Sequence, residues 1–451
     1  MLIEIHMIQN HSPANLNRDD LGAPKTCVFG GVTRARISSQ CLKRSIRRSA
    51  LFHEALERDG GVRTRRLITH LAERLSGKAN PGKDEIEFVA GVFEKCGVKR
   101  VKDKKKKAQE PDNTNIILFL PQSAIDKMAQ ALSDSSLRKD QQKIAARFAE
   151  IMGDGASVPD IALSGRMIEL DQEGLFAKLD LGVEGALSAA DAISTHGVLN
   201  EVDYFTAVDD LPRGAGTAVA EHAETGEETA TGKGSAHVDE AQFASACFYK
   251  YFSLDLDQLV SNLTPKGGDD KAKAEAKRLA AATVGHFIIA AARTTPTGKQ
   301  HSHAAFNAPS GILVEKKETK TPTSYANAFA EPARRIGVPP DDAADELSLV
   351  GRSIAQLGDF VHSHRNPQSE PFWYSPELWR YPLRGWEREP DGQRRKDKGG
   401  NPKAIPLTGN CHSSLGDEPD KPGLVQAVIG AISLKWSDVK DAGKKTAETK
   451  R

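Results

Sequence analysis

Apolar and polar residues alternate at the start of the chain, which predicts a β-strand over residues 1–11 because strand side chains point alternately to two faces. A second extended segment is expected at 26–37, where a Gly-Gly pair marks a turn. Over residues 38–58 the apolar positions recur at helical spacing, and Leu42 and Ile46 fall on one side. The start of the chain therefore predicts a strand, an extended turn and an amphipathic helix.

Short strands interleaved with helices are expected in the rest of the chain, which predicts an α+β fold interrupted by large excursions. A charged helical pattern runs over 63–150 and contains a lysine run at 102–107 without an apolar face. Residues 213–234 have almost no large apolar side chain and predict a flexible tip between two strands, while 380–422 predict an exposed insertion. The other expected elements are strands at 160–168, 202–210, 243–252 and 311–314, and helices at 185–195, 270–292, 324–336 and 342–361.

Composition limits the possible partners of this 451-residue chain. Its 62 Lys and Arg against 61 Asp and Glu give a net charge of +1, so binding to a polyanion has to rest on local patches. The sequence has no long apolar run, and its opening lacks a cationic leader, so we expect no membrane partner. Five scattered cysteines without a CxxC pair indicate a reducing compartment, and we predict a cytoplasmic location.

One side of the expected 38–58 helix carries cations beside the apolar stripe, and this row predicts a ligand with phosphate groups. Serines at the helix start add hydroxyls and free backbone amides that can face an anion. The alternative is a solvated helix whose charges bind nothing specific. The predicted phosphate-binding residues of this region are Arg18, Lys25, Ser38, Ser39, Gln40, Lys43, Arg44 and Arg47.

Two groups of residues in the sequence could hold a metal ion. Adjacent Asp19 and Asp20 beside a bound RNA can hold a divalent ion and cut a phosphodiester, although such residues more often orient an arginine or cap a turn. The pairs His301/His303 and His362/His364 lack a second paired motif at fixed spacing and are weak zinc signals. We therefore expect no metal, no cofactor and no catalytic residue, and keep a metal-dependent ribonuclease as the alternative.

Several blocks of the sequence resemble a known family. HSPANLNRDDLGAPK and FGGVTRARISSQCLKRSIRRS are similar to the opening of the backbone subunit of type I-E CRISPR Cascade, the CasC family. DIALSGRM, AISTHGV, VDYFTAVDDL, GSAHVDEAQFASACFYKY, AAFNAPSG and SYANAFAEP follow in that family's order. The blocks span residues 2–331. The lysine-rich part near 100, the tip near 225 and the tail after 365 do not match.

The resemblance implies a hand-shaped subunit with an RNA-recognition-motif-like, or ferredoxin-like, palm, a helical fingers insertion and a β-hairpin thumb. The implied divisions are palm at 1–60, fingers at 61–158, palm at 159–200, thumb at 201–250, palm at 251–365, and an exposed insertion with the C-terminal tail at 366–451.

The implied function is a non-catalytic subunit that polymerises along CRISPR RNA and holds it for pairing with target DNA in antiviral defence. A guide that pairs with any target has to be held by its phosphates and sugars, which leaves the base edges free. The implied partners are CRISPR RNA, target DNA, further copies of the chain in a helical filament, and the large, small, repeat-end and guide-end Cascade subunits. A generic single-strand RNA binder remains the plainer alternative, and the lysine run at 102–107 is either solvated or attracts DNA non-specifically.

Further site residues follow from the later blocks. Arg166 is expected to contact the RNA backbone and Met167 to pack against a base, with an ordinary palm strand as the alternative. Lys299 and His301 are expected near the RNA. A rigid apolar wedge on the thumb would displace a nucleotide at regular intervals, whereas ordinary core packing is the alternative for such a strand. The candidate wedge residues are Tyr204, Phe205, Thr206 and Val208, with Phe205 foremost.

Overall fold

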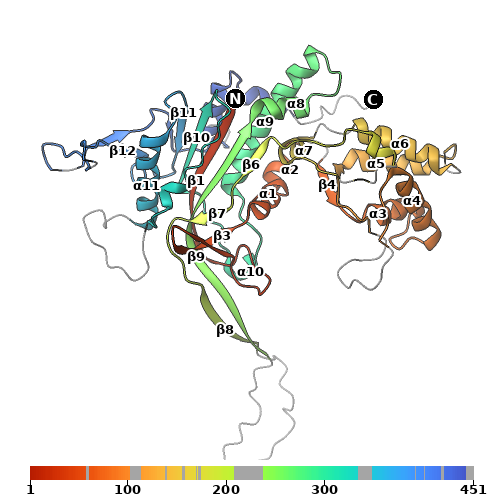
Figure 1. The fold of residues 1–451 in the computed structure, drawn as a ribbon, viewed down its shortest axis with the longest axis horizontal. Coiled ribbons are helices and arrows are strands. Elements are labelled where there is room, and N and C mark those ends of the chain that lie inside the picture. Colours follow the sequence, from red (N-terminus) through yellow and green to blue (C-terminus); the bar gives the residue numbers. More distant parts are fainter. Residues whose placement is uncertain are drawn as a thin grey trace, which may run out of the picture.

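A computed structural model gives the fold of the chain. It describes residues 1–56, 60–101, 113–137, 140–154, 158–168, 170, 174–207, 237–333, 348–391, 393–400, 402–417 and 421–442. Figure 1 shows a body of sheet and helices with three projections: a helical region on one side, a long hairpin below, and a small two-stranded arm on the other side. Within the described ranges, no helix is both long and apolar enough to cross a membrane.

The body is built on one large mixed sheet, so the α+β fold class is confirmed. Its spatial order is β14-β11-β10-β1-β9-β7-β3-β2, with β6 and β8 also paired to β9. The pairs are antiparallel except β11 with β14. The strands of this sheet are β1 (Leu2–Ala14), β2 (Thr26–Phe29), β3 (Val32–Ile37), β6 (Leu187–Ala189), β7 (Ala192–Ser194), β8 (Glu201–Ala207), β9 (His237–Asp255), β10 (Gly311–Lys317), β11 (Glu370–Tyr374) and β14 (Cys411–His412).

One face of the sheet is apolar and lies against helices. Ile3, Ile5 and Met7 of β1 point into this core, where Phe252 of β9 meets the Phe287 ring at a centroid distance of 5.3 Å. Phe287 belongs to the long α9, which the spacing of apolar residues predicted. The helices on this side are α1 (Ser39–Arg47), α2 (Ala50–His53), α7 (Pro159–Ser164), α8 (Leu256–Leu263), α9 (Asp270–Arg293), α12 (Leu424–Ala431) and α13 (Trp436–Val439).

The opposite face of the same strands is covered by a second layer. A 3₁₀ turn, η2 (Ala326–Phe329), and the helix α11 (Leu349–His364) pack on it, and Tyr249, Leu313 and Tyr325 are buried between the layers. The central strands β1, β9 and β10 are therefore covered on both faces.

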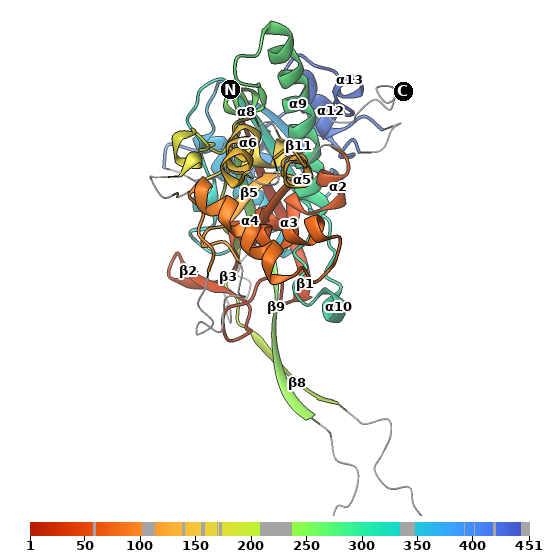
Figure 2. The same cartoon turned by 90° about the vertical axis from the view of Figure 1, so that its right-hand side faces the viewer.

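The helical region has a core of its own. Phe93 and Phe148 meet edge to face in its centre, with ring centroids 5.5 Å apart. Figure 2, turned by 90°, brings this region to the front and shows the β8–β9 hairpin extending away from the body. The elements of the region are β4 (Gly61–Thr64), α3 (Leu67–Ser76), α4 (Lys83–Cys96), β5 (Leu118–Pro121), α5 (Gln122–Ser133), α6 (Gln141–Asp154) and η1 (Leu175–Lys178). The arm on the far side contains β12 (Arg384–Trp386) and β13 (Ala404–Pro406), within the expected exposed insertion.

Four predicted elements differ from the structure. The single helix expected at 38–58 is divided into α1, which ends at Arg47, and the short α2, which begins after Ser49. The stretch 160–168 was expected as a strand but begins with α7, because Pro159 starts a helical turn and Gly165, at a φ of 76°, ends it. The Ala-rich stretch 185–195 was expected as a helix but forms the strands β6 and β7. Both strands pair with β9, whose backbone hydrogen bonds stabilise them. Of the helix expected at 324–336, the described part is only the 3₁₀ turn η2.

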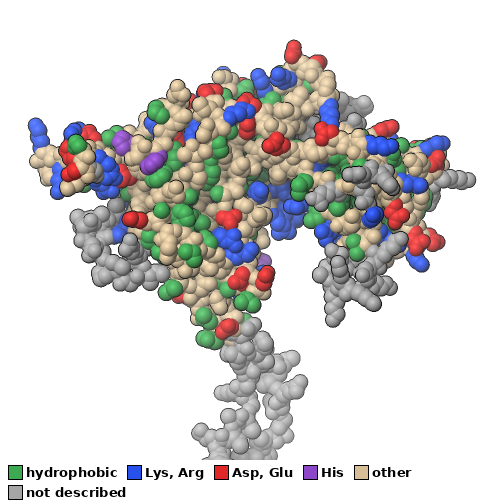
Figure 3. Space-filling model, in the orientation of Figure 1, with side chains coloured by type: hydrophobic (Ala, Val, Ile, Leu, Met, Phe, Trp, Pro, Cys, Tyr) green, Lys and Arg blue, Asp and Glu red, His purple; other side chains and the backbone are tan. Residues whose placement is uncertain are grey.

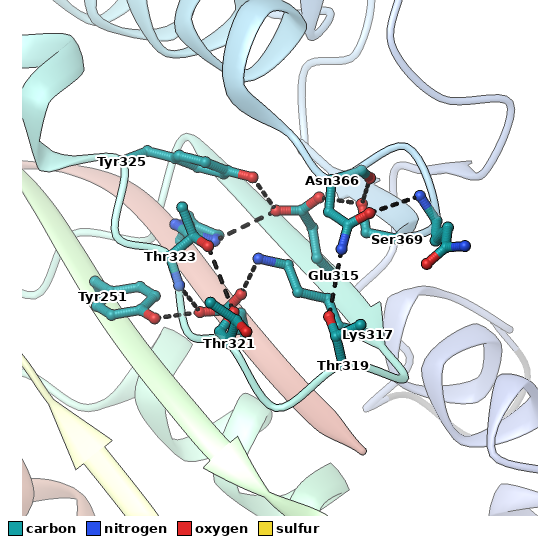
Figure 4. A network of polar contacts seen from close by, with 12 residues as sticks. Tyr251, Glu315, Lys317, Thr319, Thr321, Thr323, Tyr325, Asn366 and Ser369 are labelled. Atoms are coloured by element: carbon teal, nitrogen blue, oxygen red, sulfur yellow. Dashed lines mark hydrogen bonds and ion pairs between the residues drawn. The ribbon is translucent and has the colours of Figure 1, made fainter.

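The covered face of the sheet holds a buried network of charged and hydroxyl groups, shown in Figure 4. Glu4 of β1 pairs with Lys317 of β10 and accepts hydrogen bonds from the Tyr251 hydroxyl and the backbone amide of Thr323. Lys317 and Glu4 are almost fully buried. Since removing a charge from water is costly, this pair requires the donors that surround it.

A second carboxylate of the network, Glu315, is satisfied mainly by hydroxyls. Tyr325 donates to it at 2.6 Å and Ser369 at 2.7 Å. His6 lies 3.7 Å away, and burial holds the pKa of His6 well below its usual range, so its ring stays neutral. The hydroxyl donors come from segments that follow β10, so these carboxylates fasten the second layer to the sheet.

We predict that Lys317→Ala lowers the free energy of unfolding by about 3–5 kcal/mol, because it leaves the buried Glu4 carboxylate without its cation. Urea titration followed by circular dichroism measures the change. Lys320→Ala is the matched control, since Lys320 pairs with Asp255 and Asp257 at the exposed surface and its loss should change little. Equal effects of the two substitutions would contradict a structural role of the buried pair.

Candidate nucleic-acid interface

A cleft of about 530 Å³ lies where three segments from distant parts of the sequence meet. We call it the N-terminal cleft. The loop after β1 forms one wall, α1 forms a second, and the turn after α9 closes the third. The lining residues are Leu16, Asn17, Arg18, Asp19, Asp20, Gly22, Cys41, Arg44, Ser45, Thr297 and Gly298.

The loop after β1 is held by its own side chains. Asn15 donates to the carbonyls of Gly22 and Gln242, at 2.9 and 2.8 Å. One Asp19 carboxylate oxygen accepts from the amides of Leu21 and Ala23, both at 2.9 Å. Asp19 therefore caps a turn, which is one of the two roles that the sequence analysis considered for it. Arg18 and Asp20 are exposed beside it.

The third wall is fixed against the first by a close backbone approach. A Cβ atom on Gly298 would lie 2.6 Å from the carbonyl oxygens of Asn15 and Leu16, so only glycine fits. The next residue, Lys299, has a φ of 46° and precedes the short helix α10 (Gln300–His303), which carries His301. The loop is thus pre-formed and places Lys299, half-buried, and His301, exposed, next to the cleft.

The end of β1 anchors this second loop. Gln9 donates to the carbonyl of Asn307 at 2.5 Å, and the Asn307 side chain accepts from the Ser12 amide at 3.1 Å. His11 contacts the carbonyl of Ala305 at 3.2 Å, and burial lowers the pKa of His11 to about 3. Both loops of the cleft therefore depend on the same strand.

The start of α1 corrects one expectation. Ser38 is the N-cap, and its hydroxyl accepts from the amide of Cys41 at 3.3 Å. Asp191, which the sequence analysis did not single out, accepts from the amide of Ser39 at 2.7 Å and pairs with Arg36 at 2.8 Å. The amides of Ser39 and Cys41 are therefore already occupied and do not face a phosphate as expected.

Four of the predicted cations remain available on the loop after β1 and on α1: Arg18, Lys25, Lys43 and Arg44. None of them makes an ion pair with a residue in the described part of the chain. Arg18 and Arg44 line the cleft, and the amide of Lys25 is bound to the carbonyl of Asn17 in its wall. Gln40 of α1 is exposed.

Arg47 does not continue this row. Its guanidinium donates to the carbonyl of Gly61 at 2.9 Å, lies 3.6 Å from the Asp160 carboxylate, and stacks over the Phe119 ring at 5.3 Å. Asp160 also accepts from the amide of Gly61 at 2.8 Å. Arg47 therefore joins α1 to the helical region, which corrects its expected place in an outward-facing row.

Burial acts on both partners of this joint. It lowers the pKa of Arg47 and raises the pKa of Asp160, and in each case the charged partner works against the shift. Arg47 and the backbone amides of Gly61 and Ile161 stabilise the charged form of the Asp160 carboxylate against this burial.

Arg166 and Met167 lie on a turn after α7. Arg166 is buried and donates to the carbonyl of Leu181 at 2.8 Å, so its expected exposed contact with RNA is corrected to an internal one. Met167 is 84% exposed and stays available.

The hairpin of β8 and β9 carries the candidate wedge. Tyr204 and Phe205 pair with Glu240 and Asp239 in the strand register and are 72% and 43% exposed, so they are not core residues. Thr206 lies in β8, opposite Val238. Val208 lies outside the described residues.

Metal ligation finds no support at the histidine pairs. Across the part of the chain that the structure describes, no three His, Cys, Asp or Glu side chains are arranged to hold an ion. His303 instead lies against the Phe243 ring, at a centroid distance of 5.9 Å.

Two solved structures share this fold. A chain of a "CRISPR RNA-guided surveillance complex, pre-nicking" is 25% identical, with a TM-score of 0.64 over 96% of this chain and 100% of that chain. A chain of a "CRISPR RNA-guided surveillance complex" is 23% identical, with a TM-score of 0.56 over the same shares. No curated protein matches the chain.

The fold is thus that of chains found in CRISPR surveillance complexes, and the site is a polar cleft lined by two arginines and two aspartates. The family model for the CT1975-like protein matches residues 3–357, and the chain belongs to that family. The resemblance to a Cascade backbone subunit drawn from the sequence blocks is confirmed by these matches.

We predict that Arg47→Met destabilises the protein by about 3 kcal/mol at neutral pH, because the buried Asp160 carboxylate loses its cation. The substitution raises the pKa of Asp160 further, so the loss should shrink as pH falls towards 4 and the carboxyl becomes protonated. Thermal unfolding at several pH values tests this. Adding Asp160→Asn should remove the pH dependence. If the stability lost in Arg47→Met were the same at every pH, a charge interaction between Arg47 and Asp160 would be contradicted.

Proposed function

We propose that this chain is a backbone subunit of a type I-E Cascade surveillance complex that binds CRISPR RNA in the N-terminal cleft. The observation that carries the proposal is a set of four cations, without carboxylate partners among the described residues, on the loop and the helix that form two walls of one cleft, in a chain of net charge +1; two of them, Arg18 and Arg44, line the cleft itself. Cations gathered at one place attract a polyanion there, even though the chain as a whole is almost neutral.

The chemistry of the cleft favours the sugar–phosphate backbone over the bases. Its lining has no aromatic side chain for base stacking, and offers guanidinium, hydroxyl and amide donors instead. A guide held in this way keeps its base edges free for pairing with target DNA, as an RNA-guided complex requires.

The strand order supports an RNA-recognition-motif-like palm. In chain order β1, β7, β9 and β10 form a four-stranded sheet with the spatial order β10-β1-β9-β7, and α1 and α9 pack on one face. This is the βαββαβ arrangement of ferredoxin-like domains. Its other face, which stacks bases in RNA-recognition motifs, is closed by η2 and α11, so the RNA passes along the loops at the sheet end.

The hairpin supplies the wedge in this proposal. Tyr204 and Phe205 stand exposed on a two-stranded projection, where an aromatic side chain can separate neighbouring nucleotides without regard to sequence. Copies of the chain then stack head to tail along the guide through heterologous contacts, which generate a filament. Target DNA and the other Cascade subunits are the further partners, in the cytoplasm.

We further propose that the subunit is non-catalytic. Asp19 uses its carboxylate to hold the loop, and its neighbour Asp20 is exposed and joined by no further acidic ligand in the described ranges. This arrangement favours a turn over a two-carboxylate metal site.

We predict that Lys43→Glu combined with Arg44→Glu abolishes RNA retention and leaves the protein folded, because both side chains are free of internal partners in the described structure. Each lost charged contact should weaken RNA binding about 10- to 100-fold. RNA that co-purifies with the wild-type chain and with the variant is quantified and sequenced, and circular dichroism checks the fold.

The matched control is Lys271→Glu with Lys273→Glu, two exposed lysines at the start of α9, and it should retain RNA. Retention by the Lys43/Arg44 variant would contradict the cleft assignment. Wild-type RNA of mixed length and sequence, in place of one repeat-derived species, would favour a generic RNA binder.

The ribonuclease alternative is tested separately. We predict that the assembled complex leaves complementary RNA uncut in the presence of Mg²⁺, while Asp19→Ala loosens the loop and weakens guide retention. Cleavage products at regular spacing that vanish in Asp19→Ala or Asp20→Ala, seen on a denaturing gel, would establish the enzyme instead.

A further inference from the structure

The two-stranded arm of residues 384–406, which we call the C-terminal arm, lies beyond residue 357, where the family model ends. It projects from the body on the side opposite the helical region (Figure 1). β12 and β13 form its base, and the bridges Arg388–Arg394 and Lys396–Pro402 close two successive turns beyond it. The arm is therefore a separate feature from the N-terminal cleft.

The base of the arm is fixed to α11. Gly385 lies against the His362 side chain so closely that a Cβ atom has no room. Asp359 of α11 pairs with Arg388 and lies 3.9 Å from Arg394, whose guanidinium stacks over the Trp386 ring at 4.7 Å. An arm held by these contacts presents its outer part in a fixed direction.

The arm is more basic than the rest of the chain. Residues 384–406 contain seven Lys and Arg against four Asp and Glu, whereas the whole chain has a net charge of only +1. Arg395 and Lys403 are paired with Glu387, and Arg395 also with Glu389. Figure 3 shows Lys and Arg side chains gathered at this end of the molecule.

The remaining cations of the arm are free. Arg384, Lys396 and Lys398 are exposed and make no ion pair with any residue that the structure describes. The arm's described residues include no exposed large apolar side chain. A protein partner is bound mainly through buried aromatic and apolar anchors, whereas phosphate contacts need only accessible cations.

We propose that the C-terminal arm binds the sugar–phosphate backbone of DNA, independently of the guide in the N-terminal cleft. This inference rests on the proposed function in one respect: a Cascade subunit lies beside target DNA. Lys396 and Lys398 contact phosphates at the tip, with Arg384 nearer the base. Such contacts are independent of sequence, and counterion release makes them strongly dependent on salt.

The test measures binding of the purified protein, with whatever guide it carries, to a fluorescein-labelled duplex DNA unrelated to that guide. Fluorescence anisotropy is recorded over a series of salt concentrations. Lys396→Glu with Lys398→Glu should weaken binding at low salt at least about tenfold and reduce the log–log salt slope by about two, one for each lost phosphate contact.

Lys271→Glu with Lys273→Glu is again the matched control, since it reverses the same charges at the same spacing on the body, and it should bind DNA like the wild type. Both variants should retain guide RNA, so a failure of the arm is distinguished from a failure of the cleft. Equal DNA affinity and salt slope in the two variants would overturn the proposal. So would loss of self-assembly by the arm variant with unchanged DNA binding, which would identify a protein contact.

Discussion

The buried pair of Glu4 and Lys317 is the interaction on which the rest of the structure depends. Two charges removed from water remain stable only if polar groups surround them, and here the Tyr251 hydroxyl of the neighbouring strand β9 is joined by the Thr323 amide of the segment that covers the sheet. Glu315 imposes the same requirement on Tyr325 and Ser369. The central sheet therefore cannot leave this face open, and a face that other sheets use for binding becomes part of the interior.

Because η2 and α11 cover that face of the sheet, the proposed binding surface lies instead at the loops beyond the end of β1. β1 continues beyond the end of its pairing with β10. There Gln9 and Ser12 hold the second loop, and Asn15, just after the strand, holds the first. Both loops are thus positioned by a strand that is itself held on two faces and between two neighbours. In the proposed function, the RNA then meets a pre-formed wall, which lowers the conformational entropy that the protein loses on binding.

The pattern of apolar residues was sufficient for β1, the 26–37 hairpin, α1 and α9, because each has a clear period of its own. It was insufficient for 185–195, where alanine favours a helix but β9 supplies a pairing edge, so tertiary contacts overrode local propensity. The alternation of Glu4 and His6 with apolar residues predicted a strand correctly. Nothing local shows that these polar residues are buried, because the covering layer comes more than 300 residues later.

The same limit applies to the site. Arg18, Lys43 and Arg44 were identified from residue type and spacing, and none of them makes an ion pair with a described residue. Arg47 has the same chemistry and the same helix, but its partner Asp160 is far away in sequence. Asp191 was missed for the same reason, since it lies 152 residues from the Ser39 amide that it binds. A sequence motif can show which cations are present, and only the fold shows which of them are already used.

The near-neutral net charge of the chain is compatible with a few unpaired cations at particular sites. A subunit that stacks on copies of itself would be repelled by its neighbours if all of its cations were unpaired. Carboxylates instead occupy the arginines that build the fold, as Asp160, Asp191 and Asp359 do. The N-terminal cleft and the C-terminal arm each carry cations without an ion-pair partner among the described residues. In the proposed function, these two places attract the polyanion, while the near-neutral net charge of the chain lets its copies pack against one another.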